Sequence, residues 1–538
     1  MKKSLLILSA ASLAASSAMA QTYSAASDKC VKQATGSTLT TTAAKAAMPL
    51  YCRPEVTFYI TGATAQGSYM TGSAVPTLLL ETGYFTIREG NGTSGAAATT
   101  RKGDSTSVGW FGYGKAGTNS AGKRVYVAYN PKGSIEGVMQ VMSTTATEPE
   151  ATWVFPGDNG KCFVDPTAST TYFCGEYKAM ETGLALSDVK PEEGDLVWMK
   201  ATNGGKALPK YDSSALLSTP IGLQAFGLIV NNAFYKALRD RDIARGYLPA
   251  SCDSEAYSGV TTVTSACRPT MSRHEYASLI ATDGAKDLTF LLGASGASSK
   301  LVVDRRYGGS GTQASSNIYF LNNPCGGRGF SSTTAKASDG LGLNIDKTDK
   351  VVSNTYGGGL IPRSGTAATT NAAVTGTAYG NISVVEWTSG SDLAGTNGVA
   401  STNDFHIGVR NVAADDATGW KWIKVDGVDP IGGDLGFKSG ATTATGAAVA
   451  PFNYNLRTGR YPFSVVFYTV MTQALAKKTT DPVSKMASEL NKALLTPQVN
   501  LNGIATLPAN ASASKLEMQG TLSRPGNNNC APLKYTGA

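Results

Sequence analysis

The residues best suited to chemistry in this sequence form one short turn, Arg306 to Thr312, which reads Arg-Tyr-Gly-Gly-Ser-Gly-Thr. The turn follows an apolar strand expected at 301–303 and precedes a helix expected at 313–320. A helix that begins after a glycine turn presents unpaired backbone N–H groups, and its dipole makes that end mildly positive. Ser310 adds a hydroxyl donor, and Arg306 adds a permanent charge on a planar fork of donors. The turn is therefore predicted to bind an oxyanion.

Three further polar turns, at Thr64, Ser134 and Asp188, each follow an expected strand. The plainer interpretation is that Ser134 caps a helix and that Asp188 caps a turn. Strands that alternate with helices, however, predict an α/β fold with parallel strands. Ligands of such sheets bind beyond the carboxyl ends of the strands, so the four turns are expected to converge on one site.

The first twenty residues are predicted to be a signal peptide. Lys2 and Lys3 precede an apolar stretch, Leu5–Leu13, and Ala18-Met19-Ala20 forms a cleavage signal before Gln21. No cysteine stands at the cleavage point, and no later apolar run reaches the roughly 18–20 residues that span a bilayer. We therefore expect an exported protein without a lipid anchor, either periplasmic or secreted.

Charge and length limit the function further. Without Lys2 and Lys3 the chain carries 45 basic and 39 acidic residues, a net charge of +6 spread over more than 500 residues. This weak excess suits an anionic ligand, but no dense Lys/Arg cluster indicates nucleic-acid binding. A chain of this length is expected to form at least two domains.

The cysteine content favours disulfides over metal sites. An even number of cysteines in an exported protein, eight here, is typical of disulfides, and only His274 and His406 could supply imidazole ligands. No metal or other cofactor is expected. Local pairing is the most economical hypothesis, with the last two cysteines joining the C-terminal tail to the middle of the chain. The expected pairs are Cys30–Cys52, Cys162–Cys174, Cys252–Cys267 and Cys325–Cys530.

Four stretches are interpreted as loop insertions, near 88–123, 144–178, 245–268 and 326–380. The first is rich in Gly, Thr, Ser and Ala. It contains a Walker A-like stretch that we reject, because Arg124 stands where Ser or Thr must bind magnesium. Elsewhere, Thr270–Ile280 is expected to be a capped helix and Leu288–Leu292 a strand.

Taken in order, the four turns resemble those of the phosphate-binding proteins of bacterial ABC transporters, which have the type II periplasmic binding protein fold. The segments that carry this resemblance are Ile60–Thr64, Tyr129–Gln140, Ala185–Asp188 and Arg306–Thr312. They anchor about half of the chain, and the insertions account for much of the rest.

The resemblance implies an α/β fold with two discontinuous lobes joined by two hinge strands, together with disulfide-stapled loop insertions. Lobe 1 would comprise residues 54–225 with 465–538, and lobe 2 residues 226–464. A binding protein rather than an enzyme is implied, with inorganic phosphate as ligand and an ABC transporter permease in the inner membrane as partner. The implied phosphate-binding residues are Thr64, Ala65, Ser134, Asp188, Arg306, Ser310, Gly311 and Thr312.

Asp188 is the residue expected to decide which oxyanion binds. A carboxylate repels an anion unless that anion carries a proton to donate, as phosphate does near neutral pH and sulfate does not. Two positions depart from the family pattern. Ala65 replaces an aromatic residue, and Gly308 replaces an acidic residue that would orient Arg306.

Two other functions compete with phosphate binding. An exported surface or assembly protein that reuses this fold is the main alternative, because the insertions and disulfides favour a stable, exposed scaffold. An exported hydrolase is disfavoured, since the sequence contains neither G-x-S-x-G nor H-E-x-x-H.

Overall fold

The computed structural model describes residues 54–67, 70, 75–90, 107–142, 152–154, 162–164, 171–174, 177–179, 181–194, 212–260, 263–281, 285–322, 325, 380–387, 389–413, 416–431, 454–495, 504–507, 522–524, 527–531 and 533–535. The expected signal peptide, Cys30, Cys52 and nearly all of the insertion expected at 326–380 lie outside the described residues.

The fold is α/β, built on a mixed 15-stranded sheet whose main path runs β13-β12-β14-β10-β16-β9-β1-β4-β3-β2-β7-β6. Its strands are β1 Val56–Ala63, β2 Phe85–Glu89, β3 Val108–Tyr113, β4 Arg124–Lys132, β6 Cys162–Val164, β7 Thr171–Cys174, β9 Leu184–Ser187, β10 Leu216–Asn231, β11 Thr270–Met271, β12 Leu301–Arg306, β13 Ile382–Trp387, β14 Phe405–Asn411, β15 Trp420–Val425, β16 Ser464–Thr472 and β17 Ile504–Thr506. Two short pairs lie outside it, β5 Thr152–Val154 with β8 Tyr177–Ala179, and β18 Leu522–Ser523 with β19 Lys534–Tyr535.

The helices include α6 Val75–Leu79, α7 Ser134–Met142, α9 Asn232–Ala244, α10 Arg273–Ile280, α11 Thr289–Leu292, α12 Gly311–Leu321, α15 Gly390–Leu393, α16 Tyr454–Arg457, α17 Gln473–Lys477 and α18 Pro482–Leu494. Local sequence sets several of their starts. Ser272 and Glu275 form a reciprocal capping box at α10, which confirms the capped helix expected there. Among the described residues, no helix has both the length and the apolar character needed to cross a membrane.

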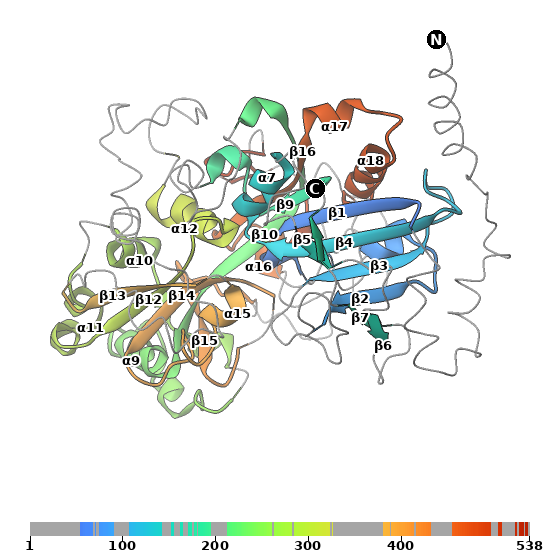
Figure 1. The fold of residues 1–538 in the computed structure, drawn as a ribbon. Helices are drawn as coiled ribbons and strands as arrows, with labels where there is room; N and C mark the ends of the chain where they lie inside the picture. The colour runs from blue at the N-terminus through green and yellow to red at the C-terminus, as the bar shows by residue number, and fades with distance from the viewer. Residues whose placement is uncertain are drawn as a thin grey trace, which may run out of the picture.

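The long strand β10 links two parts of the sheet (Figure 1). Its first residues, Leu216–Ala225, pair antiparallel with β16, and from Phe226 to Val230 it pairs with β14 instead. We call the part with β1, β2, β3, β4 and β9 the β1 half, and the part with β12, β13, β14 and β15 the β12 half. The division into lobes at this point stays a prediction.

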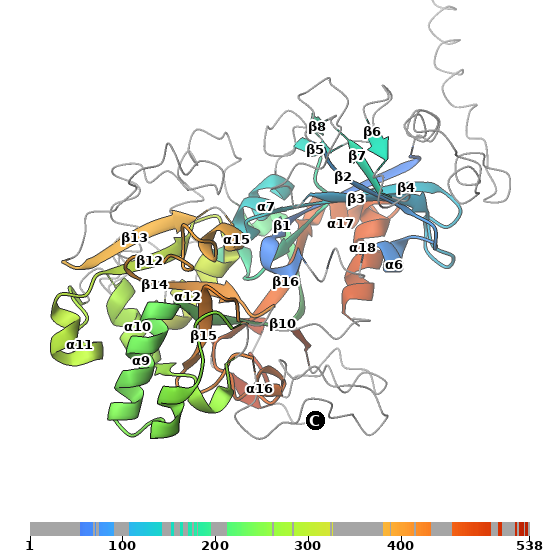
Figure 2. The ribbon, with the colours of Figure 1, turned by 90° about the horizontal axis from the view of Figure 1, so that it is seen from below.

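Each half buries its own apolar surface. In the β1 half, Met486, Leu490 and Leu494 of α18 are buried in a core with β1 and β4. Their i, i+4, i+8 spacing places them on one helix face. In the β12 half, α9 and α10 pack with β12, β14 and β15 around a second core (Figure 2). This second core continues along β10 and β16 toward α7, so the halves share apolar contacts.

Four local expectations were wrong. The range 88–123, expected as a loop, contains the fully buried strand β3. The range 144–178, also expected as a loop insertion, contains β6 and β7, which belong to the main sheet. Leu288–Leu292, expected as a strand, contains the short helix α11, because the Asp287 carboxylate accepts hydrogen bonds from the backbone and hydroxyl of Thr289. The sheet is also mixed rather than parallel, since β3, β10 and β16 pair antiparallel.

Two of the expected cysteine pairs are disulfides in the structure, Cys252–Cys267 and Cys325–Cys530. Cys174 is also disulfide-bonded, and the strand register places Cys162 opposite it. The Cys325–Cys530 bond links the region after α12 to the C-terminal segment. That segment is held to the β1 half, because Asn529 donates to both carboxylate oxygens of Glu193.

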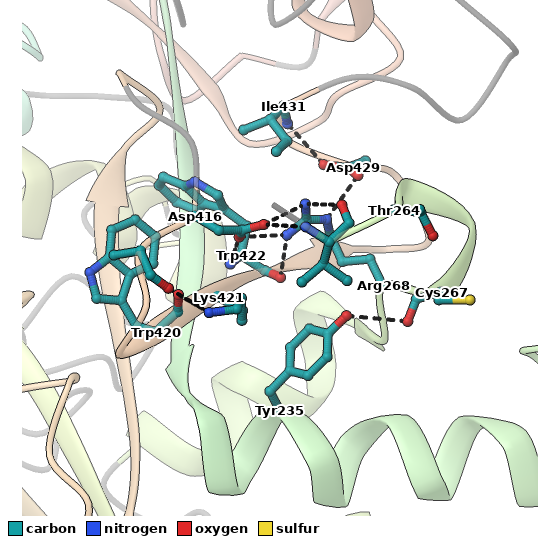
Figure 3. A network of polar contacts seen from close by, with 12 residues as sticks. Tyr235, Thr264, Cys267, Arg268, Asp416, Trp420, Lys421, Trp422, Asp429 and Ile431 are labelled. Carbon is teal, nitrogen blue, oxygen red and sulfur yellow. Dashed lines mark hydrogen bonds and ion pairs between the residues drawn. The ribbon is translucent and has the colours of Figure 1, made fainter. Parts of the chain in front are cut away.

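A buried ion-pair network fastens the expected insertion 245–268 to the β12 half (Figure 3). Arg268, only 1% exposed, donates to both oxygens of Asp416 at 2.8 and 3.0 Å and to Asp429 at 3.0 Å. The carbonyls of Trp422 and Val263 accept its remaining donors. All five guanidinium N–H groups are thereby used, as burial of this cation requires.

Candidate functional site

Parallel pairing brings three of the four predicted turns to one edge of the sheet. β1 lies parallel to β4 and to β9, with Ala63 opposite Lys132 and Gly62 opposite Leu186. The residues that follow these strands therefore emerge together: Thr64 and Gln66 in the short 3₁₀ helix η1, Thr64–Gln66, Ser134 at the start of α7, and Asp188 after β9.

Asp188 is the centre of this cluster and is 2% exposed. Its Oδ2 accepts a hydrogen bond from the Ser134 hydroxyl at 3.0 Å, and its Oδ1 accepts one from Gln66 Nε2 at 3.2 Å. Its own backbone N–H donates to Ser134 Oγ at 3.1 Å. Ser134 therefore binds the aspartate rather than simply capping α7.

Burial raises the pKa of the Asp188 carboxyl to about 6, because the charged form loses its hydration. The hydrogen bonds from Ser134 and Gln66 and the charge of Arg306 act in the opposite direction and hold the pKa below what burial alone would give. Near neutral pH the Asp188 carboxyl is thus mainly ionised and accepts hydrogen bonds, with its pKa close to the solution pH.

The fourth turn comes from the β12 half and meets the first three directly. A Cβ atom added to Gly311 would lie 2.1 Å from Ser134 Oγ and 2.6 Å from Asp188 Oδ2. Such distances exclude any side chain at this position without a rearrangement. The start of α12 therefore lies against the Ser134–Asp188 pair.

Backbone contacts join α7 to the same turn. The N–H groups of Ile135 and Glu136 donate to the carbonyl of Gly309 at 3.0 and 3.3 Å. Tyr307 donates its hydroxyl to Glu136 Oε2 at 2.5 Å. Apolar side chains of α7 and α12 also share a small buried cluster with Val189, formed by Ile135, Met139, Val189, Ala314 and Ile318. The two halves are therefore in direct contact at this point.

Arg306, at the end of β12, is 3% exposed, and its Nε donates to the Trp387 carbonyl at 3.3 Å. Burial lowers its pKa from the ordinary arginine value, while Tyr307, Asp188, Asp392 and Glu136 act to raise it. The guanidinium stays charged. Asp392, in α15, thus supplies an acidic neighbour that Gly308 cannot.

The remaining predicted residues occupy the helix starts around this cluster. Thr64 is half-buried at the start of η1, and the Ala65 carbonyl accepts hydrogen bonds from Gln224 and Asn411. Ser310 and Thr312 are buried at the start of α12.

Sequence reasoning missed Gln66, Glu136 and Asp392. Gln66 and Glu136 lie beside predicted residues, but neither residue type signals an anion site by itself. Asp392 comes from a different segment, whose proximity to Arg306 depends on the pairing of β12 with β13.

The cluster combines a buried cation, a buried carboxylate and the starts of two helices. N–H donors at helix starts and a guanidinium stabilise oxyanions, and a buried carboxylate selects partners that donate a proton. In the described state, part of this donor capacity is used by the Gly309 carbonyl.

No protein-family model matches the sequence, and no curated protein does either. Fourteen chains of known structure match. A phosphate-bound protein of Clostridium perfringens, assigned to the substrate-binding proteins of phosphate ABC transporters, shares 13% identity at a TM-score of 0.34, covering 83% of this chain and 99% of that one. An ABC-type phosphate transport receptor from Vibrio cholerae shares 10% identity at a TM-score of 0.33, covering 81% and 93%. These values are too low to assign a function to the chain. The solved structures to which it is similar include phosphate transport proteins, the family that the four turns resemble.

Proposed function

We propose that this chain is an exported substrate-binding protein that captures inorganic phosphate between two lobes and delivers it to an ABC transporter permease. The observation that carries the proposal is the buried Asp188, held by Ser134 and Gln66 where the starts of α7 and α12 meet. A carboxylate at an anion site requires a ligand that brings its own proton.

Arg306 and the helix starts would stabilise the anion, and Asp188 would accept its proton. Sulfate carries no proton near neutral pH, so its oxygens would face the carboxylate without a hydrogen bond. The site should therefore discriminate strongly against sulfate, whereas arsenate, with similar protonation, should compete.

Ligand entry requires the halves to separate. The α7 N–H groups that would bind phosphate donate to Gly309 across the site. In the proposal, residues 54–225 with 465–538 form one lobe, residues 226–464 form the other, and β10 and β16 bend as the hinge. Hinge closure around a ligand is a well-known mode of domain motion.

Calorimetric titration of the chain without residues 1–20 tests the proposal. Phosphate should bind at about micromolar affinity or tighter, and sulfate much more weakly. D188A and R306A should each weaken phosphate binding at least about tenfold, because each removes a charged partner of the ligand.

The matched controls are D240A and R245A, which remove exposed side chains of the same types. Both should bind phosphate like the wild type. Absence of phosphate binding to the wild type would refute the function, and full binding by D188A would refute the site.

A further inference from the structure

Gln66 is fully buried, and only one of its two amide atoms is hydrogen-bonded. Its Nε2 donates to Asp188 Oδ1 at 3.2 Å, whereas its Oε1 is buried and has no hydrogen-bond partner. The orientation of the amide follows from its partner, because an ionised carboxylate only accepts hydrogen bonds. Burying an acceptor without a donor is unfavourable, so this oxygen needs a donor that the described residues do not supply.

The neighbouring amide does not satisfy it. Gln224 donates its Nε2 to the Ala65 carbonyl, and its own Oε1 is likewise buried without a partner. Around η1 the site therefore offers two acceptors close together, the Asp188 carboxylate and the Gln66 amide oxygen. Acceptors of this kind match a ligand that carries more than one hydrogen-bond donor.

The charges around Arg306 favour a ligand with a single negative charge. Asp188, Asp392 and Glu136 all act electrostatically on this guanidinium, so the acidic groups near it outnumber it. Tyr307 also faces Arg306, and Tyr129 faces Asp188, but burial raises the pKa of both phenols so that they stay neutral. A dianion would meet more repulsion here than a monoanion.

We propose that Gln66 is a specificity-determining residue that selects dihydrogen phosphate: its Oε1 accepts a hydrogen bond from one P–OH group, and Asp188 accepts one from the other. This inference rests on the proposed phosphate site. Monohydrogen phosphate has a single P–OH group and leaves one of the two acceptors unpaired. Sulfate leaves both unpaired.

The test is the pH dependence of phosphate affinity, measured by calorimetry on both sides of the second pKa of phosphate and above the range in which Asp188 titrates. If dihydrogen phosphate is the bound species, the wild-type Kd should rise about tenfold per pH unit once monohydrogen phosphate dominates. Q66M removes both polar amide atoms and keeps a similar length. It should bind about tenfold more weakly where dihydrogen phosphate dominates, and its Kd should depend much less on pH.

The matched control is Q224M, which removes another buried amide with an unpaired oxygen that is not bonded to Asp188. It should keep the wild-type pH slope. Urea unfolding of each variant checks that the fold is intact. A wild type that binds phosphate with a flat pH profile, or a Q66M protein with the wild-type slope, would overturn the role of Gln66 while leaving phosphate binding in place. Failure of the wild type to bind phosphate at any pH would instead refute the function itself.

Discussion

Gly311→Ala tests a close approach between the two halves. The added methyl would lie 2.1 Å from Ser134 Oγ, 2.6 Å from Asp188 Oδ2 and 2.7 Å from Asp188 Cβ. The serine hydroxyl can rotate away, but it then loses its bond to Asp188, and the Asp188 Cβ cannot move without its strand. Inserting a methyl group into such a contact costs about 1–3 kcal/mol.

This cost should appear in one of two measurements. If the halves stay closed, urea unfolding should show a free energy of unfolding lower by about 1–3 kcal/mol. If they separate instead, small-angle X-ray scattering should show a larger radius of gyration. A penalty of this size corresponds to a shift of roughly 5- to 150-fold in the closed-to-open equilibrium.

Gly67→Ala is the matched control. Gly67 has helical dihedral angles, φ −54° and ψ −47°, and an added Cβ would meet no atom within 4 Å. This substitution should leave stability unchanged or raise it by about 0.4–1 kcal/mol, because alanine restricts the unfolded chain. A Gly311→Ala protein that matches the wild type in both stability and radius of gyration would refute the close contact.

Three other predictions concern stability. Burial raises the pKa of Glu193 from 4.5 to about 7, so between these pH values the folded state binds more protons than the unfolded state. The free energy of unfolding should therefore fall as pH rises from 4.5 to about 7, by roughly 3 kcal/mol in total. E193Q should flatten that profile in urea titrations, and an unchanged slope would contradict this. Replacing Cys325 and Cys530 by serine should lower the free energy of unfolding by about 2–5 kcal/mol. The loss should exceed that from removing the Cys252–Cys267 disulfide, because the Cys325–Cys530 bond closes a much longer loop, 205 against 15 residues. Equal losses would argue against the loop-entropy explanation. R268M should lower the free energy of unfolding by about 3–5 kcal/mol, since the buried carboxylates of Asp416 and Asp429 lose their counterion. A loss below about 1 kcal/mol would show that water already reaches these carboxylates.

The strands that end in polar turns were the readily predictable part of the fold. β1, β4 and β12 begin as apolar runs and end close to a glycine, Gly62, Gly133 and Gly308 respectively, so the signal lies within a few neighbouring residues. Disulfides between nearby cysteines are likewise a local inference. The order of strands in the sheet is not local, and the antiparallel insertion of β10 and β16 between parallel strands has no sequence signature.

The strand β3 shows why composition misled. Its two glycines gave the surrounding range the appearance of a loop, but one of them is required by packing: a Cβ on Gly109 would lie 2.4 Å from the Tyr126 hydroxyl. The residue is small because a tyrosine of the neighbouring strand β4 lies over it. A glycine in a strand often indicates such a close approach rather than a turn.

Part of the site could be predicted, because the carboxyl ends of neighbouring parallel strands lie at the same edge of the sheet. That rule brings Thr64, Ser134 and Asp188 together, but it does not reveal residues that approach from elsewhere. Asp392 lies in a helix after β13 and acts electrostatically on Arg306, so the acidic neighbour that the turn lacks at Gly308 comes from a distant segment. A motif comparison examines one segment at a time and cannot detect such compensation.

The closed contact also bears on affinity, if phosphate binds as proposed. Before the ligand can use the α7 N–H groups, their bonds to the Gly309 carbonyl and the Tyr307–Glu136 hydrogen bond must open. The observed affinity is then the intrinsic affinity reduced by the fraction of molecules that are open. Substituting Tyr307 by Phe removes the hydroxyl contacts with Glu136 and the Gly133 backbone but leaves Asp188 and Arg306 in place. Y307F should therefore bind phosphate more tightly than the wild type, and stopped-flow experiments should show a faster association rate. Weaker binding by Y307F would show that the tyrosine stabilises the ligand-bound state instead.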